Sequence, residues 1–542
     1  MSGERSWDEA HEIEGTGEPG GNVADLARDT AARLPDKPAL IFHDAPITYG
    51  EVDRQIGLAA AGFRALGIRP GDRVAVMVHN VPHFVYAYYG LLRAGGVMIP
   101  LNTMYTAEEV STIVADADAR AVVVAEPFAG TVDGLRDTLP MLEHVIVAGT
   151  TAPIGAMTWE QMIGRAGVEV SAAEGAPDDL AVLAYTSGTT GKPKGAMLTH
   201  GNLLANLDQM SHAELLAEAE DDVVLLALPL FHIYALNVIL GLTMRVGGTA
   251  VLMERFDAIA SLDAVERHHV SVLFGAPPMF IAWLNTPGVE RYDLSTVRLA
   301  VSGAAPLPGP VLEDFARKTG ITIWEGYGLT ETAPGVTSNA MGTVAKPGSI
   351  GKPLPGVEVR IVDAHGEDVE EGDPGEIWVR GPNVFRGYWR QTDATNEALA
   401  DGWFHTGDVG YADDDGYVFL VDRKKDLVIV SGFNVYPREV EDVLYRHPKI
   451  ADAAVIGIPH PYTGEAVKAF VVLAPGTTAT EEEILDFCRR SLARFKCPQV
   501  IEFVAELPHL PTGKVLRRAL REAEEGDGHA ASPVGETRGD QA

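Results

Sequence analysis

A short stretch rich in glycine, hydroxyl and lysine residues carries the clearest chemical signal in this chain. Residues 185–195 read YTSGTTGKPKG and directly follow an apolar run that is typical of a buried strand. Backbone N–H groups, hydroxyls and ammonium groups in a flexible loop of this kind can surround the phosphates of a nucleotide. A solvated turn would explain Gly-Thr-Thr-Gly alone, but the whole stretch favours an anion-binding loop.

The spacing within this loop excludes a P-loop NTPase. A P-loop has four residues between its glycines and a Ser or Thr directly after its lysine. Here Gly188 and Gly191 are separated by Thr189 and Thr190, and Lys192 is followed by proline. The loop therefore indicates another class of nucleotide-binding protein.

Residues 185–195 resemble the signature of AMP-forming acyl-CoA synthetases and other adenylate-forming enzymes. The remaining motifs of that superfamily follow in the expected order, and the resemblance covers residues 20–522. In chain order they are the adenine-pocket strand end 302–307 (SGAAPL), the ATP and magnesium motif 327–331 (YGLTE), the ribose motif 403–408 (WFHTGD), the hinge 422–426 (DRKKD) with the loop 431–437 (SGFNVYP), and the catalytic-lysine motif 511–514 (PTGK). In appearance the chain is most similar to bacterial fatty-acyl-CoA ligases.

The resemblance implies a two-step ligase reaction. A carboxylic acid and ATP would give acyl-AMP and pyrophosphate, and CoA would then take the acyl group and release AMP. Because the first step brings anions together, the site must neutralise charge and hold the reactants in line. ATP and CoA are thus the expected co-substrates, and Mg²⁺ the expected cofactor.

Two other functions compete with this interpretation. Some members of the superfamily pass the activated carboxylate, or another oxyanion, to an amine or a carrier-protein nucleophile in secondary metabolism. A non-catalytic nucleotide-binding regulator is the rival from a different class. It would be expected to lack Lys514 or Glu331, and both are present.

The resemblance also assigns the nucleotide site residue by residue. Glu331 would give Mg²⁺ a hard oxygen ligand, and Thr186 would add a hydroxyl. Lys514 would stabilise the charge of the adenylation transition state, and Asp408 would accept bonds from the ribose hydroxyls. The catalytic residues are Lys514, Glu331, Thr330 and His232. The ATP- or AMP-binding residues are Thr186, Ser187, Gly188, Thr189, Thr190, Lys194, Gly303, Ala304, Ala305, Glu325, Gly326, Tyr327, Gly328, Asp408 and Arg423. Without their motifs, Asp408 would be a turn residue, Lys514 a solvated charge and His232 a core histidine.

CoA and the acid would use neighbouring parts of the same site. By resemblance, Gly432 and Phe433 bind CoA, and Lys425 is the hinge about which the small domain rotates between the two steps. The acid pocket would be formed by His232, Tyr234, Asn237, Pro278, Met279, Gly303, Ala304, Gly328 and Val336. None of these side chains is a lysine or arginine that would pair with a second carboxylate, so a fatty or aryl monoacid is favoured.

The elements that position these motifs alternate between apolar β-branched runs and amphipathic stretches. This alternation predicts βαβ units and mostly parallel sheets. The expected strands are 73–78, 120–125, 180–185, 249–253, 271–274 and 298–302. Residues 223–244 carry no formal charge and are long enough to span a bilayer, but Pro229 and His232 interrupt them. A buried strand, a bend and a buried helix explain that segment better, so no integral membrane span is expected.

Beyond residue 345 the sequence pattern predicts short strands and tight turns, and beyond residue 425 it predicts a compact α+β domain. The predicted fold class is α/β: a large N-terminal domain of two α/β subdomains plus a small β-rich subdomain, followed by a small mobile α+β C-terminal domain. We assign residues 1–20 to a disordered arm, 21–421 to the adenylation domain, 422–425 to the hinge, 426–522 to the mobile domain and 523–542 to a disordered acidic tail.

Composition limits the partners and the compartment. The 542 residues include 43 Lys or Arg and 76 Asp or Glu, a net charge of −33, which opposes binding to nucleic acid. Anionic co-substrates must then meet local cations, and the candidates are Lys192, Lys194, Arg423, Lys424, Lys425, Lys514 and bound Mg²⁺. Cys488 and Cys497 alone make no disulfide framework, and the acidic N-terminus is no signal peptide, so a cytoplasmic protein is expected. A homodimer is compatible with the sequence.

Overall fold

The computed structural model describes residues 21–166, 170, 175–186, 193–213, 215–342, 344–423, 426–430, 433–460, 462–509 and 515–528. The chain divides into two compact units, which we call the N-terminal and C-terminal units. The N-terminal unit takes the chain up to Gly372, with Ile377–Thr406 and Ala412–Phe419; the C-terminal unit takes Asp373–Glu376, Gly407–Tyr411 and the chain from Leu420. A large N-terminal part and a small C-terminal part, both of mixed α and β structure, confirm the predicted fold class.

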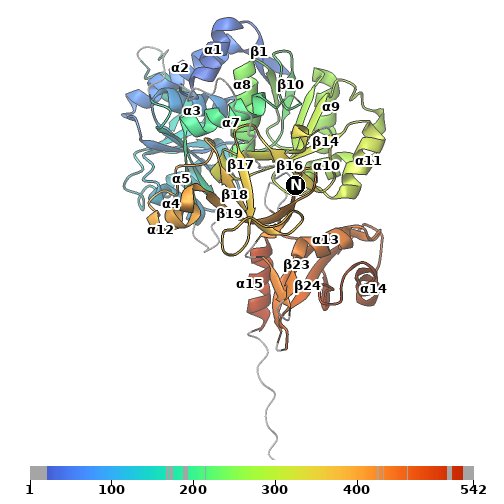
Figure 1. Cartoon of the computed structure of the whole chain (residues 1–542). Coiled ribbons are helices and arrows are strands. Elements are labelled where there is room, and N and C mark those ends of the chain that lie inside the picture. Colours follow the sequence, from blue (N-terminus) through green and yellow to red (C-terminus); the bar gives the residue numbers. More distant parts are fainter. Residues whose placement is uncertain are drawn as a thin grey trace, which may run out of the picture. The chain divides into compact units, whose positions relative to one another are not determined.

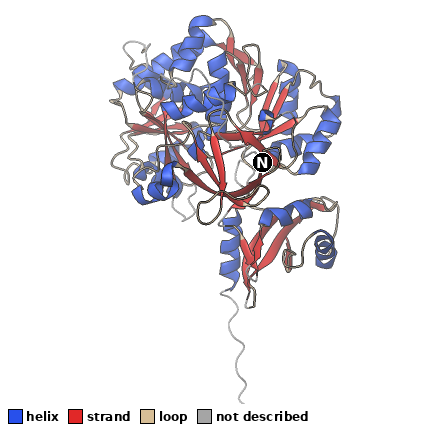
Figure 2. Cartoon of the chain, in the orientation of Figure 1, coloured by secondary structure: helices blue, strands red, loops and turns tan. Residues whose placement is uncertain are grey.

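One sheet of the N-terminal unit has seven described strands in the order β7-β6-β5-β3-β4-β8-β9. Only β8 and β9 are antiparallel neighbours. The strands are β3 (Arg73–Met77), β4 (Val97–Pro100), β5 (Ala121–Ala125), β6 (His144–Ala148), β7 (Met157–Thr158), β8 (Leu180–Thr186) and β9 (Lys194–Thr199). Every residue of β5 is buried, as expected for a parallel strand covered on both faces. Figure 2 shows the strands in the interior of this unit and helices on its outside.

A second path of thirteen described strands runs β17-β18-β19-β20-β16-β15-β14-β13-β12-β10-β11-β1-β2. The neighbours from β14 to β1 are parallel, and β14, β15, β16 and β20 pair antiparallel. The strands are β1 (Pro38–Phe42), β2 (Ala45–Thr48), β10 (Val223–Leu226), β11 (Thr249–Leu252), β12 (Val272–Gly275), β13 (Leu299–Ser302), β14 (Ile323–Gly328), β15 (Gly335–Ser338), β16 (Ser349–Pro353), β17 (Glu358–Val362), β18 (Gly375–Arg380), β19 (Phe404–Ala412) and β20 (Val418–Arg423).

These strands match the sequence patterns. Each of the six strands expected between residues 73 and 302 is present, with each end within one residue of the expected position. The β-rich stretch beyond residue 345 forms β16 to β20, but these strands continue the hydrogen-bonded path of β14 and β15. The turn-rich pattern predicted the strands correctly and could not reveal that they extend the parallel sheet.

Helices connect these strands. The α-helices of the N-terminal unit are α1 (Asp25–Arg33), α2 (Tyr49–Ala65), α3 (Pro82–Arg93), α4 (Ala107–Asp116), α5 (Ala129–Asp133), α6 (Trp159–Ile163), α7 (His200–Ser211), α8 (Leu242–Val246), α9 (Ala258–His268), α10 (Pro277–Leu284), α11 (Gly309–Thr319) and α12 (Thr392–Ala398). The short 3₁₀ segments are η1 (Glu126–Phe128), η3 (Val289–Arg291), η4 (Thr330–Thr332), η5 (Asn339–Met341) and η6 (Ala400–Gly402). Helix α7 begins with a capping box of Thr199 and Asn202, which fixes its start directly after β9.

The uncharged segment 223–244 folds as a buried strand followed by helices. After β10 the chain bends at Pro229, then forms the π-helix η2 (Tyr234–Gly241) and α8. Among the described residues, no helix combines the length and apolar character needed to cross a bilayer. The strand, bend and helix expected for this segment are therefore confirmed.

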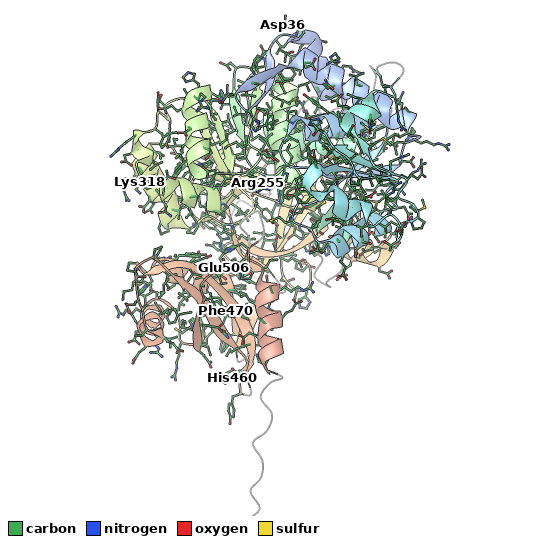
Figure 3. All side chains as sticks on the ribbon, turned by 180° about the vertical axis from the view of Figure 1, so that it is seen from behind. Asp36, Arg255, Lys318, His460, Phe470 and Glu506 are labelled. Carbon is green, nitrogen blue, oxygen red and sulfur yellow. The ribbon has the colours of Figure 1, made fainter. Side chains whose placement is uncertain are left out.

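The C-terminal unit has its own sheet and its own core. Its strands are β21 (Val428–Val430), β22 (Phe433–Val435), β23 (Ile450–His460), β24 (Gly464–Leu473) and β25 (Val500–Phe503), and its helices are α13 (Pro437–Tyr445), α14 (Glu481–Ser491) and α15 (Arg517–Gly528). Figure 1 shows these three helices around β23 and β24. Phe470 of β24, labelled in Figure 3, is buried with Leu507 and Leu520. The Thr480 side chain caps α14 by accepting the Glu483 N–H.

Helix α15 extends into the segment that the sequence assigns to a disordered tail. It ends at Gly528, beyond the expected boundary at residue 522, and its Glu524 forms an ion pair with Lys468 of β24. This ion pair connects the last part of the helix to the sheet. The predicted arm 1–20 and residues 529–542 lie outside the described residues.

Candidate active site

The phosphate loop is carried by β8 and β9, which end the seven-stranded path. Thr186 at the end of β8 pairs with Lys194 at the start of β9, so the two ends of the loop are held together. The Tyr185 hydroxyl donates to Asp116 Oδ2 at 2.5 Å, which ties the same end to α4. The pKa of Tyr185 is raised, first by burial and then by this carboxylate. Of the predicted loop residues, Ser187, Gly188, Thr189, Thr190 and Lys192 lie outside the described residues.

Glu331 and Thr330 lie in η4, the short turn that joins β14 to β15. Glu331 is 9% exposed, and its Oε1 accepts a hydrogen bond from the Tyr388 hydroxyl at 2.9 Å. The Nζ of Lys194 lies 5.0 Å from the centre of the same tyrosine ring. Lys194 and Glu331 belong to motifs far apart in the sequence, and Tyr388, which the sequence analysis did not single out, contacts both.

Buried carboxamide side chains support the turn after Glu331. Asn383 Nδ2 donates to the carbonyls of Thr332 at 2.8 Å and Gly335 at 2.9 Å, and Asn237 Nδ2 donates to Ala333 O at 2.8 Å. Asn383 is fully buried and Asn237 is 1% exposed. Asn237, which was expected to line the acid pocket, holds the backbone of the turn that follows Glu331. Bonds from side chains to backbone carbonyls are inexpensive to satisfy and costly to lose in a buried turn.

The adenine-pocket motif forms a sharp turn at the end of β13. Ala304 is exposed and adopts φ +70°, an uncommon conformation for a residue with a Cβ. Ala305 follows and is half-buried. Glu325, predicted to bind ATP, is 5% exposed and accepts the Leu307 N–H at 3.1 Å, so its carboxylate holds this turn in place. Strained residues of this kind concentrate at ligand sites.

Two glycines of β14, Gly326 and Gly328, differ in how much space their neighbours leave for a Cβ atom. A Cβ on Gly328 would lie 2.1 Å from Pro334 O, whereas one on Gly326 would lie 3.4 Å from Thr337 O. Gly328 therefore allows β15 to approach β14 closely, directly before Thr330 and Glu331. Tyr327, between the two glycines, is half-exposed.

Aromatic and neutral groups surround the end of β13 on the expected acid side. The Tyr234 ring lies over Gly303, where a Cβ would be 3.0 Å from Tyr234 Cε1, and meets Phe274 edge to face at 6.0 Å. His232 Nδ1 accepts the Tyr234 N–H at 3.3 Å, and burial lowers the pKa of His232 to about 4. His232 is thus neutral at pH 7. Met279 and Val336, two more predicted pocket residues, are buried.

The remaining predicted residues belong to the second half of the chain. Asp408 on β19 is 3% exposed, and its neighbour Gly407 donates its N–H to Glu376 Oε1 at 3.1 Å. Arg423 ends β20. Phe433 is 58% exposed and its ring lies 4.9 Å from that of Phe495. Lys425, Gly432 and Lys514 lie outside the described residues, as does Lys424.

An ionic cluster in the C-terminal unit was not foreseen from the sequence. Arg517 donates to Glu441 Oε2 at 2.6 Å and to Asp422 Oδ1 at 3.4 Å, and lies 3.6 Å from Asp426 Oδ2. Burial lowers the pKa of Arg517, but the three carboxylates together outweigh it and raise that pKa. Asp422 also accepts the Arg438 N–H at 2.9 Å. This cluster joins the first residue of the predicted hinge to the start of α15, close in sequence to Lys514.

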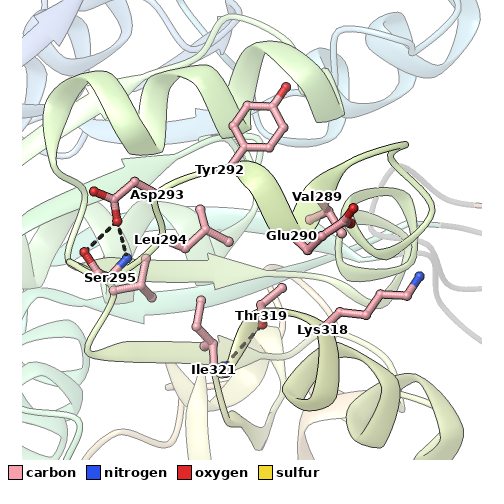
Figure 4. A pocket seen from close by; sticks show the side chains of 11 residues that line it. Val289, Glu290, Tyr292, Asp293, Leu294, Ser295, Lys318, Thr319 and Ile321 are labelled. Carbon is pink, nitrogen blue, oxygen red and sulfur yellow. Dashed lines mark hydrogen bonds between the residues drawn. The ribbon is translucent and has the colours of Figure 1, made fainter.

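Two surface pockets lie away from these residues. One of about 360 Å³ is lined by η3 and the end of α11, with Asp293 accepting bonds from the Ser295 N–H and hydroxyl (Figure 4). The other, of about 440 Å³, lies between α1, Leu204 and Arg245. Neither contains a residue of the predicted site. The described residues contain no group of three or more His, Cys, Asp or Glu side chains that would hold a metal ion.

Comparison with known proteins decides the family. A family model described as AMP-binding enzyme matches residues 27–389, and one for the AMP-binding enzyme C-terminal domain matches residues 439–514. The chain belongs to the AMP-binding enzymes. It is an AMP-forming acid–CoA ligase, which activates a carboxylic acid as its adenylate and then forms the CoA thioester.

Its relatives include ligases named for fatty acids and ligases named for aromatic acids. A long-chain-fatty-acid–CoA ligase of Bacillus subtilis is 37% identical over 539 residues, which cover 94% of this chain and 96% of the relative. A feruloyl-CoA synthase of Amycolatopsis is 39% identical over 500 residues, covering 91% and 96%. The crystal structure of an anthranilate CoA ligase in complex with anthranoyl-AMP superimposes with a TM-score of 0.87 at 29% identity, covering 94% of this AMP-binding enzyme and 98% of that chain.

Proposed function

We propose that the substrate of this acid–CoA ligase is a monocarboxylic acid with an apolar body, either aryl or fatty. The observation that carries the proposal is the uncharged lining at the end of β13. His232 is neutral, and the aromatic side chains Tyr234 and Phe274 form an apolar wall beside Gly303. A second carboxylate on the substrate would find no cation among these described residues, and burying it unpaired would be costly.

Mg²⁺ is the proposed cofactor of the adenylation step. Mg²⁺ is usually held by one or two carboxylates together with the phosphates of a nucleotide, so a site with a single carboxylate suits it. Glu331 and Thr186 would hold the ion, and the ion would neutralise phosphate charge. The 9% exposure of Glu331 supports this role, because a nearly buried carboxylate gains from a cationic partner.

The other residues would bind and orient the two anions. Lys194 and residues 186–190 would surround the phosphates, Tyr327 would lie against the adenine, and Gly303 and Ala304 would leave room for it. Asp408 and Arg423 would bind the ribose and its phosphate. Thr330 would donate a hydrogen bond to the α-phosphate, and Lys514 would bind both the carboxylate and the α-phosphate as the acyl–oxygen–phosphorus link forms.

The CoA step would use another face of the C-terminal unit. Rotation about Lys425 would withdraw Lys514 and bring Gly432 and Phe433 to the passage for the pantetheine arm, whose thiolate attacks the acyl carbonyl and displaces AMP. Cys488 and Cys497 are buried free thiols, which supports a cytoplasmic protein. Size-exclusion chromatography with light scattering would show whether it is a homodimer.

A pyrophosphate-release screen tests the substrate class. The purified chain would be assayed with ATP, Mg²⁺ and CoA against benzoate and cinnamate derivatives, fatty acids of about six to sixteen carbons, and the matching dicarboxylic acids. These acids cover the range of ligand sizes that small-molecule pockets hold. We expect turnover of aryl or fatty monoacids and little of their dicarboxylic partners. Preference for a dicarboxylic acid would contradict the proposal.

A further inference from the structure

The most informative residue outside the predicted site is Tyr388. It follows β18 and lies at the point where two separately predicted parts of the nucleotide site meet. Its hydroxyl donates to Glu331 Oε1 at 2.9 Å, and its ring faces the Lys194 ammonium at 5.0 Å. One side chain thus contacts both the carboxylate proposed to bind the cation and a lysine proposed to bind phosphate.

The backbone around Tyr388 is fixed on both sides. On one side, the segment 386–389 lies along β9: Met197 N–H donates to Gly387 O at 3.0 Å and Trp389 N–H to Gly195 O at 2.8 Å. On the other, Phe385 N–H donates to the backbone carbonyl of Glu331 at 2.8 Å. The segment therefore bridges the return strand of the phosphate loop and the turn η4.

The position of the ring is restricted as well. Tyr388 N–H donates to Thr395 Oγ1 at 2.9 Å, and the Phe385 ring packs edge-on against it at 4.9 Å. Gly387 has φ +128°, and a Cβ there would lie 2.5 Å from Thr395 Cγ2, so the close turn before Tyr388 requires glycine. These contacts leave the hydroxyl directed at Glu331.

We propose that Tyr388 is a positioning residue that couples the phosphate loop to Glu331. A neutral hydroxyl donor fixes the plane of the Glu331 carboxylate without cancelling its charge, so the carboxylate is oriented before nucleotide and cation arrive. The electron-rich face of the Tyr388 ring attracts the Lys194 ammonium, so one side chain contacts both Glu331 and Lys194. The inference rests on the proposed function, since it concerns how that site is assembled.

Two substitutions separate the hydroxyl from the ring. Tyr388→Phe keeps the ring under Lys194 and removes only the donor to Glu331. We expect it to raise the Mg²⁺ concentration needed for half-maximal adenylation by about tenfold, the loss typical of a hydrogen bond to a charged group. Binding of ATP in EDTA, measured by calorimetry, should stay unchanged. Tyr388→Leu should weaken that Mg²⁺-free binding as well, because it removes the partner of Lys194.

Tyr445→Phe is the matched control. Tyr445 also donates to a carboxylate, Asp452 Oδ1 at 2.7 Å, but it belongs to the C-terminal unit. It should shift neither the Mg²⁺ dependence nor ATP binding. Thioester formation from supplied acyl-AMP should survive both Tyr388 variants. An unchanged Mg²⁺ dependence in Tyr388→Phe, or equal loss of both half-reactions, would overturn the inference. A wild-type chain that makes no adenylate would instead overturn the proposed function.

Discussion

At the scale of single residues, the site depends on groups whose charge is set by burial. Glu331 is nearly buried beside a neutral donor, and His232 is enclosed with no charged partner among the described residues that would favour its protonation. Desolvation alone lowers the pKa of His232, so its imidazole is a neutral group that accepts the Tyr234 N–H. The same burial makes His232 a stability determinant in acid.

The pH dependence of folding tests this state of His232. Its folded pKa of about 4 lies below the unfolded value of 6.5, so protons bind the unfolded chain first. The contribution of neutral His232 to the free energy of unfolding is therefore fully present above pH 6.5. It is lost as the pH is lowered through 4, and the total loss from this residue is about 3 kcal/mol. In denaturant unfolding at several pH values, His232→Gln should show a shallower loss than wild type. Exposed His365→Gln is the control, and a His232→Gln curve parallel to wild type would contradict the assignment.

At the scale of elements, the turn η4, which carries Thr330 and Glu331, is positioned by the strands on either side of it. The close approach of β14 and β15 requires Gly328, and buried amides of Asn237 and Asn383 hold the backbone that follows. Packing on both sides of the turn therefore fixes the positions of Thr330 and Glu331.

Two alanine substitutions in one strand test this dependence. Gly328→Ala would place a Cβ against Pro334 O, and we expect destabilisation near the upper end of the about 1–3 kcal/mol typical of overpacking. Gly326→Ala makes only an ordinary contact and should cost less than about 1 kcal/mol. Thermal and urea unfolding measure both. Equal effects of the two would show that β15 moves freely away from β14.

The ionic cluster at Arg517 allows a similar comparison. Arg517→Met leaves the carboxylates of Asp422, Asp426 and Glu441 without this partner, and removal of one member of a buried ion pair typically costs about 3–5 kcal/mol. The neighbouring Arg518→Met breaks an exposed pair with Glu522 and should change stability by less than about 1 kcal/mol. Differential scanning calorimetry would compare them, and similar unfolding temperatures would contradict a structural role for the cluster.

The sequence predicted local features better than partnerships between distant segments. Apolar β-branched runs located β3, β8 and β13, because each run reflects its own residues. Tyr388, Asn383 and Arg517 act through residues about 50 or more positions away, so no local pattern marked them. Glu325 and Asn237 were predicted to bind ligands from their motifs alone, and no local pattern indicated the bonds to backbone groups that each makes in the structure.

At the scale of the whole molecule, a chain with a net charge of −33 binds two polyanionic co-substrates. The long-range field repels them, so binding must depend on local cations, which the proposed Mg²⁺ would supplement. The proposed rotation about Lys425 would meet this need, because it would present different cations of the C-terminal unit in the two half-reactions.

Lys514→Ala tests this alternation. Adenylation, followed as pyrophosphate release, should fall by about a thousandfold, since an electrostatic stabiliser of the transition state is lost. Thioester formation from supplied acyl-AMP and CoA should stay within a few-fold of wild type, because Lys514 would be withdrawn in that step. Equal loss of both steps would contradict rotation about Lys425.

We propose that this AMP-binding enzyme transfers the acyl group of an apolar monoacid to CoA through an acyl-adenylate. Mass spectrometry of reactions with the best acid from the screen, with and without CoA, tests it directly. We predict enzyme-bound acyl-AMP without CoA, and acyl-CoA with stoichiometric AMP and pyrophosphate when CoA is added. Formation of AMP and pyrophosphate with an unchanged CoA pool would contradict the account.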